Sequence, residues 1–239
     1  MPFFYYYWDP TYILILIGAV ISMIASARVR NTYHKYARVN SASRMTGQQT
    51  AEKILRMNGI TDVSVQRVRG ELTDHYDPRH KVIRLSAGVY DSASVAAIGV
   101  AAHECGHVLQ HAEEYVPLKI RGALVPIVNF GSYASWFFIL FGLLWQSESS
   151  YLFIRIGILL FSFAVLFQLV TLPVEFNASK RALAELESGR ILRTEETRDA
   201  KKVLGAAAMT YVAAVIAALL QLLRIIIIAG GRRGEYRDK

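Results

Sequence analysis

The chain has 239 residues, 53% of them hydrophobic, and its mean hydropathy is positive. This length allows one catalytic domain with a few membrane spans, and the composition is more apolar than that of a typical soluble domain. The formal net charge is +8. The basic residues stand beside apolar runs, not in a stripe with interleaved aromatics, which argues against nucleic-acid binding. A single cysteine, Cys105, excludes an intrachain disulfide.

The first apolar run is Tyr12–Ala27, and it follows the aromatic cluster Phe3–Trp8. Aromatic rings of this kind favour the lipid headgroup zone. A signal peptide would carry positive charge before the run, whereas here Arg28 and Arg30 follow it. We therefore expect residues 1–27 to be an uncleaved membrane anchor.

A more polar segment, residues 28–122, follows the anchor. Within it, Ala51–Met57 has a helical pattern that ends at Asn58-Gly59. Alternating residues predict strands over Val63–Val68 and Lys81–Leu85, with a turn-rich connection over Asp74–Pro78. A helix is expected from Asp91, as its N-cap, through Val108.

Two apolar runs, Leu124–Trp145 and Tyr151–Val174, are separated only by Gln146–Ser150. So short a loop predicts an antiparallel transmembrane hairpin over residues 123–174. Residues 175–202 are polar with a helical pattern. The final segment, 203–239, is an apolar helix with a basic tail, and we expect this helix to span the membrane.

The basic residues predict how these segments are oriented. They cluster after the first run, before the second and after the third: Arg28, Arg30, Lys35, Arg38, Arg44, Lys119, Arg121, Lys180 and Arg181. The positive-inside rule then places residues 28–122 and 175–202 in the cytoplasm of a multi-pass plasma-membrane protein. The last run departs from this rule, because its tail residues Arg232, Arg233, Arg237 and Lys239 would lie outside. Packing on the catalytic part, or in the interface, is the alternative for that run.

The chemistry is carried by the H-E-x-x-H motif from His103 to His107. Two histidines four residues apart share one face of a helix and can bind one zinc ion. Zinc lowers the pKa of a bound water to about 7, and Glu104 is placed to act as the general base that takes its proton. Cys105 would face away from the metal and serve packing. We expect one Zn²⁺ per chain.

A catalytic zinc usually takes a third protein ligand. His111 lies on the same helical face as His107, but a full turn further along, about 6 Å of extra rise, which a straight helix cannot bring to the same ion. Glu175 begins the polar segment after the hairpin and so returns to the membrane face of His103. From position alone, Glu175 is either the third ligand or an ordinary carboxylate at a helix N-terminus.

Three stretches of the chain resemble one bacterial family: Thr73-Asp-His-Tyr-Asp-Pro78, Arg84-Leu-Ser86 and Ala96–His107. These closely resemble the neutral zinc metallopeptidases of the YugP-like type, and the likeness extends over nearly the whole chain. More distantly the layout is similar to the HtpX and CaaX prenyl protease families. There a membrane hairpin separates H-E-x-x-H from a ligand glutamate, which implies Glu175 as the third ligand. Those relatives often have Asp four residues after that glutamate, where this chain has Ser179.

Four further residues are candidates for stabilising the oxyanion or contacting substrate: His75, Tyr76, Arg181 and Asn177. Their alternatives are structural, since His75 and Tyr76 can order a turn and Arg181 can pair with Glu185 one turn on. The strand Lys81–Leu85 could offer an edge to an extended peptide.

We therefore predict an α+β fold in which a zincin-like, gluzincin-type catalytic domain with a small β-sheet is anchored by three or four membrane helices. The expected function is a zinc endopeptidase acting on membrane or membrane-proximal proteins at the cytoplasmic surface, with a peptide or protein substrate and the bilayer as partners. One alternative is a non-catalytic scaffold with a structural zinc site. The other is an intramembrane site-2-type protease, although the apolar stretch before His103 is short.

Overall fold

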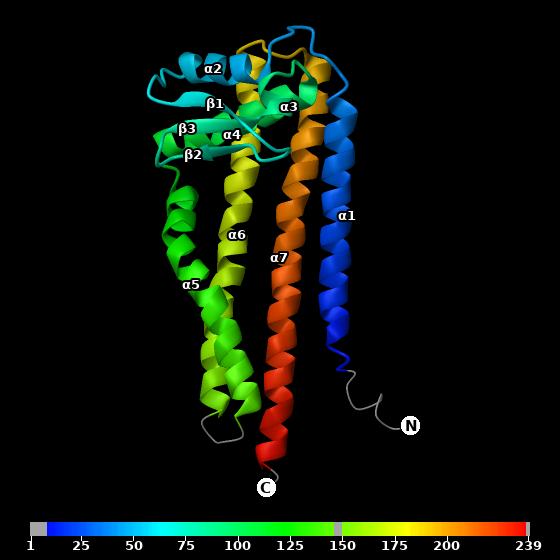
Figure 1. Ribbon diagram of the computed structural model, residues 1–239, viewed down its shortest axis with the longest axis vertical. Coiled ribbons are helices and arrows are strands. Elements are labelled where there is room, and N and C mark those ends of the chain that lie inside the picture. The colour runs from blue at the N-terminus through cyan, green and yellow to red at the C-terminus, as the bar shows by residue number, and fades with distance from the viewer. Residues whose placement is uncertain (1–8, 146–149, 238–239) are drawn as a thin grey trace. The chain divides into compact units, whose positions relative to one another are not determined.

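The computed structural model describes residues 9–145 and 150–237. Figure 1 labels its elements, which in chain order are α1 (Tyr12–Tyr36), α2 (Gly47–Met57), β1 (Ser64–Val68), β2 (His75–Asp77), β3 (Val82–Ser86), α3 (Ala87–Tyr90), α4 (Val95–Ala112), α5 (Val116–Leu144), α6 (Ser150–Ser188) and α7 (Thr194–Arg237). The aromatic cluster Phe3–Trp8, the loop residues 146–149 and the side chains of the basic tail lie outside the described part of the chain.

The chain divides into two compact units. Unit 1 comprises Met1–Ile24, Lys119–Thr171 and Tyr211–Lys239, and unit 2 comprises Ala25–Leu118 and Leu172–Thr210. Helices α1, α6 and α7 each contribute to both units. All residues of the H-E-x-x-H motif, together with Glu175, belong to unit 2.

Among the described residues, four helices are long and apolar enough to cross a membrane: α1, α5, α6 and α7 up to Gly230. Within unit 1, glycines let α5 and α6 pack closely. A Cβ added to Gly142 would lie 2.7 Å from Ile154 Cγ1, and one added to Gly157 would lie 2.5 Å from Ile139 Cγ1. The predicted membrane hairpin is thus a tightly packed helix pair. The basic residues left open whether the last apolar run spans the membrane. It lies in α7, which is one of the four candidate spans.

Unit 2 contains a three-stranded sheet with the order β1-β3-β2, visible in Figure 1. β1 runs parallel to β3, and β2 runs antiparallel to it. The prediction that Lys81–Leu85 presents a sheet edge is therefore wrong, because β3 has a partner on each side. The edge next to α4 is β2, which forms in the segment expected to be a turn. Three residues are too few to show an alternating pattern, and Arg84 of β3 secures β2 through a 2.6 Å ion pair with Asp77.

Local signals account for the helix starts in unit 2. Thr46 and Gln49 form a reciprocal capping box at the start of α2. For α4 the cap is Ser94, whose hydroxyl accepts a hydrogen bond from the Ala97 N–H at 3.2 Å. Asp91 was predicted for this role, and that prediction is wrong. Asp91 instead ends the short helix α3 and pairs with Arg67 at 2.7 Å.

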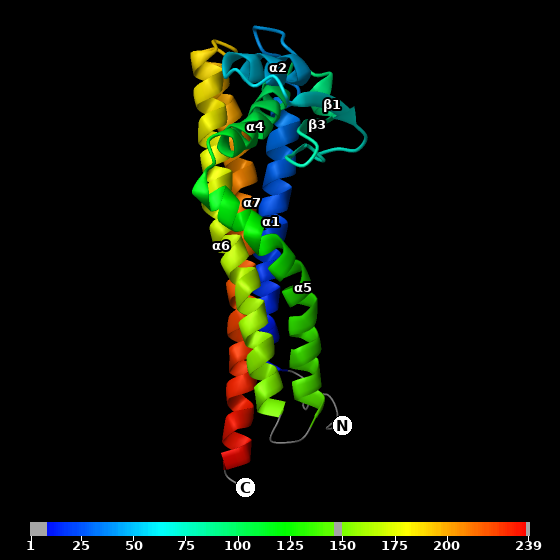
Figure 2. The ribbon, with the colours of Figure 1, turned by 90° about the vertical axis from the view of Figure 1, so that its left-hand side faces the viewer.

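The core of unit 2 is built around α4, which carries fully buried residues along most of its length. Ile98, Ala101 and Cys105 pack in one hydrophobic cluster with Ala182 and Leu186 of α6. Figures 1 and 2 both show α4 crossing this part of α6. α6 continues through Pro173 without a break, so the polar residues from 175 to 188 lie on the same continuous helix.

Candidate metal centre

Helix α4 places two imidazoles side by side. His103 and His107 are separated by one helical turn, and their ring centroids lie 4.8 Å apart with the planes at 84°. Their side chains are only 16% and 13% exposed. Since both residues sit on a helix that is anchored by the core of unit 2, their geometry is largely preset.

Glu175 reaches the two rings from α6. Its Oε2 atom lies 3.3 Å from His103 Nε2 and 3.5 Å from His107 Nε2, and its side chain is 3% exposed. All three potential ligand atoms lie within 4.8 Å of one another. Ligands about 2.0–2.1 Å from a tetrahedral zinc are separated by about 3.3–3.4 Å. The two glutamate–histidine separations are close to this value, and the donor types suit zinc. These are the three residues that the sequence and its family resemblance predict as the ligands.

Each histidine also makes a polar contact through its second ring nitrogen, Nδ1. His103 Nδ1 lies 3.1 Å from Ser179 Oγ, and His107 Nδ1 lies 3.0 Å from Gln110 Oε1. Partners of this kind orient metal-binding imidazoles and leave Nε2 for the metal. Ser179 lies four residues after Glu175 on α6, and its hydroxyl makes the contact with His103.

Gln110 was missed by the sequence analysis. It lies three residues after His107, on the same helical face, and it is fully buried. The sequence did offer a signal for this residue, because a glutamine one turn beyond a ligand histidine can reach its imidazole. Its second contact is with α6, so only the tertiary structure reveals that it joins the two helices.

The electrostatic surroundings favour positive charge at His107. Burial alone would lower the pKa of this imidazole. The carboxylates of Glu175 and Glu104 and the hydrogen bond to Gln110 outweigh burial and raise the pKa of His107 above its usual range. The same field would stabilise a cation placed between these groups.

Glu104 follows the first histidine and is 7% exposed. In the part of the chain that the structure describes, its carboxylate makes no hydrogen bond or ion pair with another side chain. Its charge acts on the neighbouring His107 and raises the pKa of that imidazole, so Glu104 belongs to the electrostatic surroundings of the ligands.

The remaining candidates fall into two groups. His75 and Tyr76 lie on the edge strand β2. The Nδ1 atom of His75 contacts the carbonyl of Thr73 at 2.8 Å, and the Tyr76 ring lies edge-on to His111 with centroids 6.1 Å apart. His111 is not part of the three-residue cluster found among the described residues.

Asn177 and Arg181 follow Glu175 on α6. Arg181 Nε donates to Asn177 Oδ1 at 2.8 Å, and its two Nη atoms donate to Glu113 at 2.6 and 2.7 Å. The sequence alternative of an Arg181–Glu185 pair is thus replaced by a pair with Glu113, at the C-terminal end of α4. Neither residue is one of the three clustered ligands.

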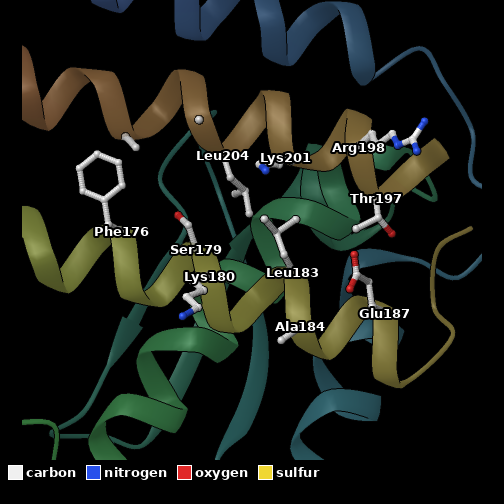
Figure 3. Close-up of a pocket in the computed structure, with 12 residues that line it drawn as sticks. Phe176, Ser179, Lys180, Leu183, Ala184, Glu187, Thr197, Arg198, Lys201 and Leu204 are labelled. Atoms are coloured by element: carbon white, nitrogen blue, oxygen red, sulfur yellow. The ribbon is translucent and has the colours of Figure 1, made fainter. Parts of the chain in front are cut away.

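A groove of about 570 Å³ lies between α6 and α7 in unit 2. In Figure 3, Leu183 of α6 and Leu204 of α7 point toward each other across it, and Ser179 lines the same wall of α6. The two histidines and Glu175 are not among its lining residues. The groove shares Ser179 with the metal centre, because the Ser179 hydroxyl contacts His103.

Comparison with known proteins identifies the family of the chain. The chain is 47% identical over 225 residues to a Bacillus subtilis protein named "Putative membrane protease YugP", an alignment that covers 94% of this chain and 99% of that protein. No solved structure matches. Residues 11–230 match the family model described as "Putative neutral zinc metallopeptidase", and the chain belongs to that family.

Proposed function

We propose that the chain is a membrane-anchored zinc endopeptidase that hydrolyses peptide bonds of membrane or membrane-proximal proteins at the cytoplasmic surface. The convergence of His103, His107 and Glu175 within 4.8 Å carries the proposal. Glu104 follows His103 in the chain, and its charge acts on His107. Two histidines and a glutamate are the ligand set of gluzincin-type peptidases, with one open position for substrate and water. We infer one zinc per chain in a zincin-like domain.

His103, His107 and Glu175 would hold the ion in this mechanism. Zinc, when bound, supplies a Lewis acid that polarises a carbonyl and acidifies water. Glu104 accepts a proton as the water oxygen attacks the peptide carbonyl carbon. The same carboxyl then returns that proton to the amide nitrogen as the C–N bond breaks, so acid and amine products form without net proton change. Burial of the site strengthens each of these interactions.

Substrate would pair with the edge strand β2. Its partner β3 occupies one side of β2, and β2 also packs beside α4, as Figure 1 shows. An extended peptide added to this edge would run past the metal ligands, held by its main chain. Tyr76 is then the preferred oxyanion donor of the four candidates, because its ring already contacts His111, one turn beyond His107.

The orientation follows from the positive-inside rule. Lys and Arg are absent from Gln146–Ser150 and frequent in residues 28–44. Unit 2, which holds the ligands, would therefore face the cytoplasm of the cell that carries this protein in its plasma membrane. No nucleic acid is expected as a partner.

The test is a comparison of three variants in the purified full-length protein in detergent. Glu104→Gln should bind one equivalent of zinc and lose cleavage of a casein or membrane-peptide substrate by about 1,000-fold or more. His107→Ala should lose both zinc and activity. His111→Ala, on the same helix face, is the matched control and should retain zinc.

The scaffold with a structural zinc site is the second candidate. This scaffold predicts that the zinc-loaded wild-type protein cleaves no peptide substrate. It also predicts that wild type and Glu104→Gln have equal peptidase activity. The intramembrane alternative finds less support, since α4 is not among the four described helices suited to span a membrane.

A further inference from the structure

We propose that Asn177 and Arg181 are positioning residues of the metal centre. Acting through Gln110, and together with the Val174 carbonyl, they keep a proton on the Nδ1 nitrogen of His107. This inference rests on the proposed function, because it concerns the same zinc site. It replaces substrate contact as the role for Asn177 and Arg181.

The orientation of the Gln110 side-chain amide is determined by its neighbours on α6. Gln110 Nε2 lies 2.7 Å from the Val174 carbonyl oxygen and 2.9 Å from Asn177 Oδ1. A carbonyl oxygen only accepts, so the atom of Gln110 that faces it must be the NH₂ group. The amide oxygen of Gln110 is therefore the atom that points back toward His107 on the same helix.

The orientation of Asn177 is determined by Arg181. Arg181 Nε lies 2.8 Å from Asn177 Oδ1, and a guanidinium only donates. Asn177 Oδ1 thus accepts from both Arg181 and Gln110. A flipped Asn177 would point its NH₂ group at two donors, which would leave buried groups unsatisfied.

Arg181 is itself held in place by α4. Its Nη1 and Nη2 atoms donate to the two carboxylate oxygens of Glu113 at 2.6 and 2.7 Å. This bidentate pair orients the guanidinium plane. The guanidinium side chain is 22% exposed and the Glu113 side chain 59% exposed, so the chain of contacts runs from the surface to the buried Gln110.

His107 is the end of this chain. Since Gln110 Oε1 only accepts, the contact at 3.0 Å requires a proton on His107 Nδ1. A neutral imidazole then has its lone pair on Nε2, the atom 3.5 Å from Glu175 Oε2. The Val174 carbonyl only accepts and the Arg181 guanidinium only donates, so the contacts between them keep a proton on His107 Nδ1 and leave Nε2 as the nitrogen for the metal.

The experiment measures zinc affinity of the full-length protein in detergent, by competition with a chromophoric chelator. Gln110→Met and Asn177→Leu should weaken zinc binding about 10- to 100-fold, the usual loss when a partner behind a ligand is removed. Asn177→Asp keeps an oxygen acceptor toward both donors, and should stay within about threefold of wild type. The zinc affinity of Arg181→Met should lie between that of Asn177→Leu and that of Asn177→Asp.

Asn177→Asp has nearly the same shape as wild type, so retained zinc affinity in this variant separates a positioning role from a general effect on stability. The thermal midpoint of each zinc-free variant is measured as well. Zinc affinity of Asn177→Leu equal to wild type would overturn the inference, as would equal losses in Asn177→Leu and Asn177→Asp. If Asn177→Leu does not fold, Arg181→Met decides, and unchanged zinc affinity with a raised KM would assign Arg181 to substrate. A wild type that binds no zinc would defeat the proposed function itself.

Discussion

Gly106 of α4 faces the main chain of Ala178 on α6 so closely that a Cβ at residue 106 would lie 2.4 Å from the Ala178 carbonyl oxygen. Gly106 stands between Glu104 and His107 in the motif, and Ala178 is three residues after Glu175. This contact therefore sets how near the α6 carboxylate comes to the two imidazoles. A backbone oxygen cannot swing aside as a flexible side chain can.

Gly106→Ala should push α4 and α6 apart. We expect zinc affinity to fall at least about 10-fold, because ligand geometry tolerates little displacement, and the thermal midpoint to fall with it. Gly99→Ala is the matched control on the same helix. Its Cβ would meet Ala200 Cβ at 3.5 Å, an ordinary contact, and alanine favours a helix by up to about 1 kcal/mol. Equal zinc affinities in the two variants would contradict the packing argument.

Ser179 allows a second test of the residues that contact the ligand histidines. Its hydroxyl contacts His103 Nδ1, so Ser179→Ala should weaken zinc binding by about 10-fold. Ser179→Asp restores an acceptor of greater strength and should bind zinc at least as tightly as wild type. Chelator competition measures both, and the prediction is wrong if Ser179→Asp binds more weakly than Ser179→Ala.

Orientation in the membrane can be read by cysteine labelling. Cys105 is fully buried, and burial raises the pKa of its thiol well above the usual value, so the native protein should give little background. In intact cells, an impermeant maleimide should label Ser147→Cys and spare Ala42→Cys. Ala42 is exposed in unit 2 and should react only after permeabilisation. Labelling of Ala42→Cys in intact cells would place the metal centre outside.

The Asp77–Arg84 pair predicts a pH dependence of stability. The hydrogen bond from Arg84, followed by that from His80, holds the pKa of the Asp77 carboxyl well below its usual range. A depressed folded-state pKa contributes stability above the unfolded value of about 3.9, and that contribution is lost as the pH falls toward the folded value. Asp77→Asn should therefore lower the thermal midpoint at pH 7. The gap from wild type should narrow steadily below about pH 4, and a constant gap down to pH 2 would contradict the assignment.

The sequence by itself determined the local chemistry of this protein. Periodicity and composition predicted helices suited to a membrane, the strands β1 and β3, and two histidines on one helix face with a glutamate between them, since each depends on residues near in sequence. Local signals misassigned two features: Asp91 looked as good a cap as Ser94, and β2 was too short to show a pattern.

Only the tertiary structure decided how Glu175, 68 residues after His107, meets the imidazoles. Position alone left this carboxylate an even choice between ligand and helix terminus. The approach of α6 to α4 depends on Gly106, on the buried cluster around Ala182 and on the hydrogen bonds of Gln110. These contacts join residues far apart along the chain, and no periodic pattern encodes the distance between two helices.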